Sequence, residues 1–200
     1  FVYRRNPRVL QQTADLCFLK EPGHNVLFIT MRFQQYTAPV QAKGLEDTAF
    51  YRYNALVSLN EVGGDPSRVG RSVASFHEAN RHRLVRWPVT MLATSTHDTK
   101  LGEDVRARIN VLSELVDAWG YEVSRWMRLN RAARTLVDGE PAPDRNDEYR
   151  FYQVLVGVWP PGLATPVAPA SLVARVRDYM TKATKEAKLH TSWLSPNDAY

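Results

Sequence analysis

Hydrophobic residues recur along most of this chain at the spacing of an α-helix. The strongest stripe contains Val105, Ile109, Leu112, Val116 and Trp119, at successive steps of four, three, four and three. Residues at these steps share one helix face, so the stripe predicts a helix with one buried side. The chain is therefore expected to be mainly helical.

Weaker stripes predict further helices, which end at proline or glycine. They are expected over residues 9–20, 26–36, 45–59, 123–136, 149–159 and 170–188, with Pro39 as a breaker and 141–146 as a polar loop. Asp65-Pro66 is typical of an N-cap followed by a first-turn proline. We expect the helix that begins there to bury Val69, Val73 and Phe76.

One segment has a different pattern. Residues 87–96 are short, β-branched and apolar, with Pro88 near the beginning, where a strand tolerates proline. This composition predicts that the segment is a buried strand. His97, Asp98, Thr99 and Lys100 then follow its carboxyl end.

Composition excludes several classes of protein. The 200 residues are 44% hydrophobic and 24% charged, which argues against a disordered tail, a collagen-like repeat or a coiled-coil rod. No apolar run approaches the roughly 20 residues that span a bilayer. The first residue is Phe1, and no signal-like stretch follows it, so we expect the sequence to begin inside a longer one. The single cysteine, Cys17, fits a reducing, cytoplasmic location.

The net charge of +5 raises the question of nucleic-acid binding. The arginines are spread along the chain and alternate with acidic residues, as in residues 103–108. Such patterns are typical of solvated helix faces with ion pairs between neighbouring turns. A helical module that binds nucleic acid through the arginines of residues 125–134 stays open as an alternative.

The first candidate site is His97-Asp98. Polar residues beyond the carboxyl end of a strand line the active face in α/β folds. A carboxylate between an imidazole and an ammonium can bind a hydroxyl-rich ligand. The alternative interpretation is that Asp98 caps the next helix.

The second candidate site contains Lys43, Glu46, Phe50 and Tyr51. Aromatic rings stack on the apolar faces of sugars, and charged groups bind sugar hydroxyls. On spacing alone, Phe50 and Tyr51 fit equally a helix core, with Lys43 and Glu46 as a surface pair. The histidines show no metal-ligand spacing, and no glycine-rich phosphate loop follows a strand.

Residues 93–100 and 103–108 closely resemble the maltooligosyltrehalose synthase family, which belongs to the α-amylase superfamily. Two departures are Gln41, where the family pattern has methionine, and Leu101, where it has arginine. The resemblance extends over nearly the whole chain and includes residues 32–35, 42–44, 46–53, 60–66, 146–149 and 188–193.

The resemblance implies that the family chain is several times longer than this one. Its fold is a (β/α)8 barrel with helical insertions. A complete barrel needs roughly 250 residues. The chain would then be mainly α, with a helical insertion and about one barrel strand, which the resemblance places at about residues 90–95. The implied divisions are a helical insertion at 1–86, a barrel strand with its active-face loop and following helix at 87–120, and a helical region at 121–200.

The implied activity is that of a glucosylmutase, an intramolecular transglycosylase. It would convert the reducing-end α-1,4 bond of a maltooligosaccharide into an α,α-1,1 trehalose bond. By resemblance, Asp98 is an acid that binds the sugar at the reaction centre and His97 bonds the same sugar. Lys100 would reach the neighbouring glucose, and Lys43 and Glu46 would form a lid over it.

The resemblance also has implications for partners. The nucleophile and the general acid/base would lie upstream of Phe1, so the isolated chain is expected to be inactive. No metal or organic cofactor is required. The expected partners are the maltooligosaccharide, the remainder of the longer chain and a trehalose-releasing hydrolase, with no nucleic acid and no membrane. A non-catalytic glucan-binding module stays open as an alternative.

Overall fold

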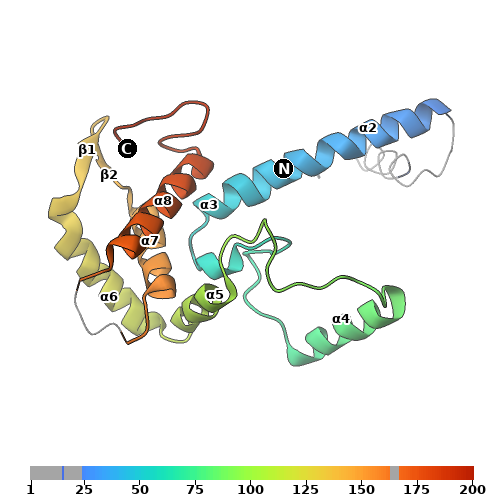
Figure 1. Cartoon of the computed structure of the whole chain (residues 1–200), viewed down its shortest axis with the longest axis horizontal. Coiled ribbons are helices and arrows are strands. Elements are labelled where there is room, and N and C mark those ends of the chain that lie inside the picture. Colours follow the sequence, from blue (N-terminus) through green and yellow to red (C-terminus); the bar gives the residue numbers. More distant parts are fainter. Residues whose placement is uncertain (1–14, 16–23, 163–166) are drawn as a thin grey trace. The chain divides into compact units, whose positions relative to one another are not determined.

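The computed structural model describes residue 15, residues 24–162 and residues 167–200. Its described part is predominantly helical, which confirms the predicted fold class (Figure 1). The expected helix over residues 9–20, including Cys17, lies almost entirely outside the described residues. The helices and strands are α2 (His24–Gln41), η1 (Ala42–Ala49), α3 (Phe50–Arg52), η2 (Val57–Leu59), α4 (Val73–Arg86), α5 (Glu103–Asn110), η3 (Val111–Ser113), α6 (Val116–Leu129), η4 (Asn130–Ala133), β1 (Thr135–Val137), β2 (Glu140–Ala142), α7 (Arg145–Val158) and α8 (Ala170–Ala187).

The chain divides into two units, Phe1–Leu45 and Glu46–Tyr200. In the first unit, α2 contains Pro39 and continues to Gln41, so the prediction that Pro39 breaks this helix is wrong. Pro39 removes one backbone donor from the interior of the helix, which costs stability but does not end the helix here. The wide turn η1 follows directly. The three functional divisions stay a prediction.

The core of the second unit forms where α5 packs against η2 and α7. Its buried members are Val57, Leu101, Ile109 and Leu112. Ile109 and Leu112 confirm the predicted stripe, whereas Val116 is exposed. The reason is that the helix is interrupted after η3, and Val116 begins a separate helix, α6.

Side chains of α7 bind the backbone of residues 50–60. The amide of Gln153, which is fully buried, accepts from Val57 N at 2.9 Å and donates to Asn54 O at 2.8 Å. Arg150 donates to Phe50 O, and Asn60 Nδ2 donates to the same oxygen at 2.8 Å. Residues 53–56 are therefore held in an irregular path, and the continuous helix predicted over 45–59 does not form.

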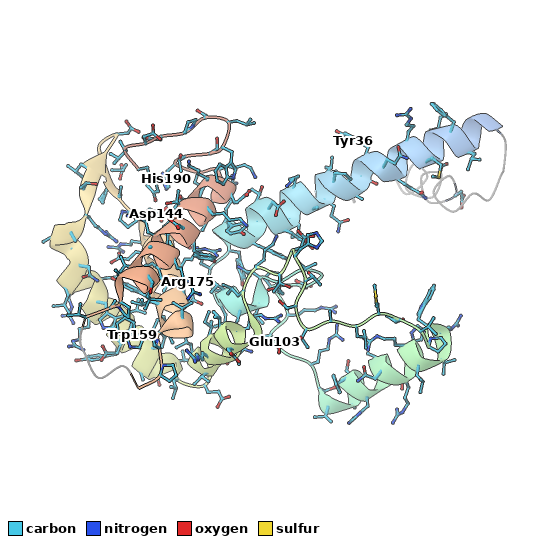
Figure 2. The ribbon with its side chains drawn as sticks, viewed as in Figure 1. Tyr36, Glu103, Asp144, Trp159, Arg175 and His190 are labelled. Carbon is cyan, nitrogen blue, oxygen red and sulfur yellow. The ribbon has the colours of Figure 1, made fainter. Side chains whose placement is uncertain are left out.

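Helix α8 has nearly the predicted bounds, and α7 ends close to the predicted position but begins earlier than predicted, at Arg145. Asp144 caps α7 by accepting from Asp147 N at 2.7 Å. His190 lies beside Asp144, with Nε2 2.8 Å from Oδ2 (Figure 2). The ring of Tyr200 stacks on His190 at 4.5 Å, and its hydroxyl donates to Asp147 Oδ2 at 2.6 Å. Burial raises the pKa of Asp147 above its usual value, although the bond from Tyr200 opposes this rise.

The predicted loop at 141–146 is replaced in part by a β-hairpin. Strands β1 and β2 pair antiparallel, with Thr135 opposite Ala142. The turn residues Asp138 and Gly139 have positive φ values of 54° and 85°. Asp-Gly is a favoured two-residue hairpin turn because both positions accept this conformation.

The predicted strand at 90–95 is not formed. Residues 87–96 are irregular, and the side chains of Val89, Met91 and Leu92 are exposed. A buried strand requires neighbouring strands to pair its backbone groups, and β1 and β2 pair only with each other in the described chain. The segment is apolar, but within the described residues it has no sheet to join.

Helix α4 begins later than predicted. Its N-cap is Ser72, whose hydroxyl accepts from Ser75 N at 3.1 Å. Asp65 instead closes a local turn by accepting from Ser67 N at 3.0 Å. Val69, Val73 and Phe76 are exposed, which corrects the prediction that this helix buries them. Among the described helices, none combines the length and apolar character needed to cross a membrane.

Candidate functional site

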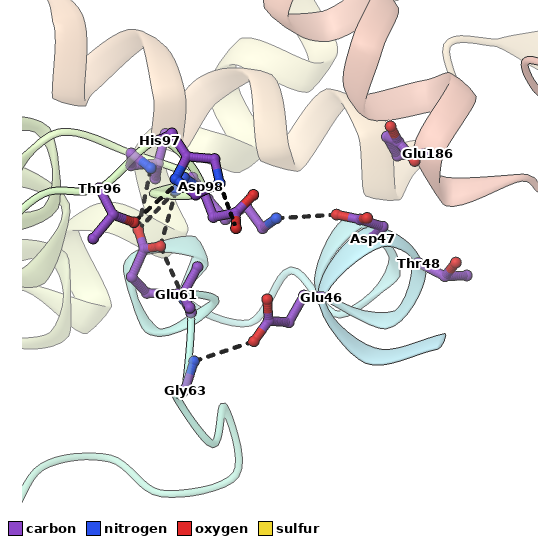
Figure 3. A network of polar contacts seen from close by, with 12 residues as sticks. Glu46, Asp47, Thr48, Glu61, Gly63, Thr96, His97, Asp98 and Glu186 are labelled. Carbon is purple, nitrogen blue, oxygen red and sulfur yellow. Dashed lines mark hydrogen bonds and ion pairs between the residues drawn. The ribbon is translucent and has the colours of Figure 1, made fainter. Parts of the chain in front are cut away.

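The loop before α5 carries the first candidate residues. His97 and Asp98 lie at its outer edge, with side chains 91% and 61% exposed and 3.3 Å apart (Figure 3). Two threonines shape the loop beneath them. Thr96 N donates to Thr99 Oγ1 at 2.7 Å, and Asp98 N donates to Thr96 Oγ1 at 3.3 Å. These bonds fix the backbone locally and leave the Asp98 carboxylate open to a ligand.

Asp98 is not the cap of the following helix. The N-cap of α5 is Gly102, and its first turn contains Glu103 and Asp104. The alternative interpretation of Asp98 as a capping residue therefore loses its structural basis. An exposed carboxylate on a shaped loop is free to accept hydrogen bonds from sugar hydroxyls.

Glu61 holds the carboxyl side of this loop. Its carboxylate accepts from Lys100 N at 2.9 and 3.1 Å and from Leu101 N at 3.2 Å (Figure 3). It also accepts from Val62 N at 2.9 Å. Glu61 lies within the stretch 60–66 that carries the family resemblance, but no spacing rule connects it with a loop 39 positions away.

The Lys100 ammonium has a protein partner. Its Nζ lies 3.0 Å from Asp47 Oδ1, and both side chains are largely buried. The contact of Lys100 with a sugar stays a prediction, and in this structure its ammonium forms an ion pair. Asp47 is a residue that sequence analysis did not select.

Glu46 and Lys43 both lie in η1. The Glu46 carboxylate accepts from Gly63 N at 3.2 Å, where the backbone has a φ of 70° that glycine adopts readily (Figure 3). Glu46 therefore belongs to the same polar network as Glu61 and Lys100. Lys43 is exposed and belongs to the other unit.

Phe50 and Tyr51 are core residues, with 2% and 4% of their surface exposed. Tyr51 packs on Ala183 and Ala187, and the Arg150 guanidinium lies over its ring at 5.1 Å. Burial raises its pKa well above the usual value. Rings buried this deeply cannot stack on a sugar, so the structure corrects the predicted sugar contact to a core role.

The described residues contain no group of three or more side chains arranged to hold a metal ion. Two of the arginines considered for nucleic acid are already paired. Arg125 lies 2.9 Å from Glu122, and Arg134 bonds Glu148. An arginine that is neutralised within the protein contributes less to binding phosphate.

Comparison with known proteins finds similar sequences among curated proteins. No family model matches the chain. Two curated proteins of Mycobacterium tuberculosis, from strains CDC 1551 / Oshkosh and ATCC 25618 / H37Rv, carry the name maltooligosyl trehalose synthase. Each is 43% identical over 170 residues, which is 85% of this chain and 20% of the relative. The chain therefore spans about one fifth of the length of these relatives.

Solved structures agree with the sequence comparison. A crystal structure of a maltooligosyl trehalose synthase matches with a TM-score of 0.72 and 42% identity, covering 84% of this chain and 21% of that one. The maltooligosyltrehalose synthase of Arthrobacter ramosus matches with a TM-score of 0.71 and 38% identity, covering 90% and 21%. By sequence and by structure, this chain is similar to about one fifth of a maltooligosyl trehalose synthase.

Proposed function

We propose that this chain is part of a glucosylmutase that rearranges the reducing end of maltooligosaccharides. The reaction would move the terminal glucose from an α-1,4 to an α,α-1,1 bond and so form a trehalose unit. The observation that carries the proposal is the match in both sequence and structure, at 42% identity and a TM-score of 0.72. The exposed carboxylate of Asp98 supplies a group suited to the substrate.

Asp98 is proposed to bind hydroxyls of the sugar at the reaction centre, and His97 to bond the same ring. Retaining enzymes use two further carboxyl groups, a nucleophile and a general acid/base, roughly 5–5.5 Å apart. A carboxylate that binds the flattened ring more tightly than the ground-state ring lowers the barrier selectively. This role requires a fixed backbone. The bonds between Thr96, Asp98 and Thr99, and the bond from Lys100 N to Glu61, support it.

The test is an assay of the full-length protein with maltopentaose. We expect loss of reducing ends without an equal release of glucose, because the freed glucose is transferred rather than hydrolysed. The isolated 200-residue chain, shown to be folded by circular dichroism, should give no turnover above a buffer control. Hydrolysis to glucose as the main reaction of the full-length protein would contradict the proposal.

Lys43 and Glu46 are proposed to cover the freed glucose. Exclusion of water from the site suppresses hydrolysis, the competing reaction. Lys43→Ala in the full-length protein should therefore raise glucose release relative to transfer. Lys182→Ala is a matched control, because Lys182 is exposed on α8. An equal ratio of hydrolysis to transfer in both variants would exclude the lid.

A further inference from the structure

We propose that Glu61 is a positioning residue for the Asp98 loop, and that it acts together with Arg106. The inference rests on the proposed function, since it concerns how the chain presents Asp98 to substrate. Neither Glu61 nor Arg106 is a neighbour of Asp98 in the sequence. Their effect would pass through the backbone of residues 94–101.

Glu61 fixes the carboxyl side of the loop. Its two oxygens accept from consecutive backbone donors, Lys100 N and Leu101 N, at 2.9 to 3.2 Å. The side chain is only 14% exposed, so water competes weakly for these bonds. Bonds from a neutral donor to a charged acceptor are stronger than bonds between neutral groups.

Arg106 fixes the amino side of the loop. Its Nη2 donates to Thr94 O at 2.9 Å, and its Nη1 lies 4.0 Å from Glu61 Oε2. The Arg106 side chain is 25% exposed. Thr94 and Lys100 are thus tied to two side chains that themselves form an ion pair.

The arrangement brackets Asp98 on both sides. Between Thr94 and Lys100, hydrogen bonds within the loop join Thr96, Asp98 and Thr99 to one another. The loop carries its candidate residues outward, with His97 and Asp98 exposed, so packing does little to hold them. The anchored ends therefore determine where the Asp98 carboxylate lies.

The geometry also predicts the effect of replacing Glu61. Glutamine at position 61 has one accepting oxygen instead of two and carries no charge for Arg106. At least one of the bonds to Lys100 N and Leu101 N would then be lost. A displacement of about 1 Å at a reacting centre costs on the order of 100-fold in rate.

The experiment uses Glu61→Gln in the full-length protein with maltopentaose. We expect kcat to fall about 10- to 100-fold with KM changed less than about threefold, because the substrate contacts themselves remain. Hydrogen exchange should accelerate at the amides of residues 94–101 and stay unchanged in α7 and α8. Glu103→Gln is the control, since Glu103 is an exposed acid at the start of α5.

A second variant keeps the inference testable if Glu61→Gln unfolds. Arg106→Gln removes the tie to Thr94 and should lower kcat with the same KM and exchange signature. A normal kcat in either folded variant would overturn the proposal. So would exchange that accelerates throughout the unit, because that result indicates general loss of structure.

The two proposals fail in different ways. Absence of trehalose-forming turnover in the wild-type full-length protein would overturn the proposed function. The exchange measurement would then still report whether Glu61 holds residues 94–101. Active wild type together with an unaffected Glu61→Gln variant would overturn the positioning role alone.

Discussion

The Lys100 ammonium lies 3.0 Å from the Asp47 carboxylate, and the two side chains are only 12% and 22% exposed. The pair connects the end of η1 with the loop that carries Asp98, across 53 positions of sequence. Loss of one partner leaves a largely buried charge without its counterion, which is costly. The pair therefore couples the stability of the fold to the candidate site.

A double-mutant cycle measures the interaction energy between Lys100 and Asp47. Lys100→Met and Asp47→Asn should each destabilise the chain, and the two together should cost less than the sum by about 1–3 kcal/mol. The cycle of Arg125→Met with Glu122→Gln is the control, because that pair is more exposed and should couple by about 0.5 kcal/mol or less. Free energies of unfolding from urea titrations give both values. Equal coupling in the two cycles would contradict the expected effect of burial.

The Asp98 carboxylate should matter for activity and not for folding. Asp98→Asn in the full-length protein is expected to lower kcat by about 10²–10³, as loss of one preorganised electrostatic contact does. The melting temperature should change little, because the side chain is 61% exposed and caps no helix. Asp104→Asn, six positions along the chain, is the control and should keep normal turnover. Near-normal turnover of Asp98→Asn would remove Asp98 from the site.

Two helical glycines give opposite stability predictions. A Cβ at Gly157 would lie 2.6 Å from Val105 Cγ1 and 3.1 Å from Ile109 Cδ1, whereas one at Gly120 would meet nothing within 4 Å. Gly157→Ala should destabilise the chain by about 1–3 kcal/mol through overpacking. Gly120→Ala should stabilise it by up to about 1 kcal/mol, because alanine favours a helix. Thermal denaturation of the two variants checks the difference in sign.

The Asp147 carboxyl predicts a pH dependence of stability. Burial raises its pKa above the usual 3.8, so the folded chain binds this proton more tightly than the unfolded chain does. The contribution of Asp147 to the free energy of unfolding is fully present below about pH 3.8. It is lost as the pH rises through the higher pKa that this carboxyl has in the folded chain. Wild type should therefore gain stability relative to Asp147→Asn as pH falls from 7 to about 4. A constant difference between the two proteins would contradict the raised pKa.

Regular helices were predictable from sequence because their signals are local. The stripe containing Ile109 and Leu112, the proline stop after α7 and the extent of α8 all depend on neighbours within a few turns. The hairpin was missed although Asp138-Gly139 is a strong turn signal, because the flanking strands are only three residues long. The start of α4 was misplaced because Asp65 and Ser72 are both good caps, and only the structure distinguishes them.

The candidate site was predictable only in part. Asp98 and His97 carry recognisable chemistry and lie exposed, as a ligand-binding pair requires. Glu61, Asp47 and Arg106 act through contacts between distant parts of the chain, and no periodicity reports such contacts. The strand predicted at 90–95 failed for a related reason. Its composition is local, but a strand forms only where other strands accept its hydrogen bonds.

The bonds from α7 to residues 50–60 also have a consequence for synthesis on the ribosome. Phe50 O receives its bond from Arg150, a residue made 100 positions later. At about 5–20 residues per second, that partner emerges roughly 5–20 seconds after Phe50. During this interval the irregular stretch lacks the side chains that hold it. A nascent chain that stops before α7 thus presents residues 50–60 to chaperones or proteases in an unfinished state.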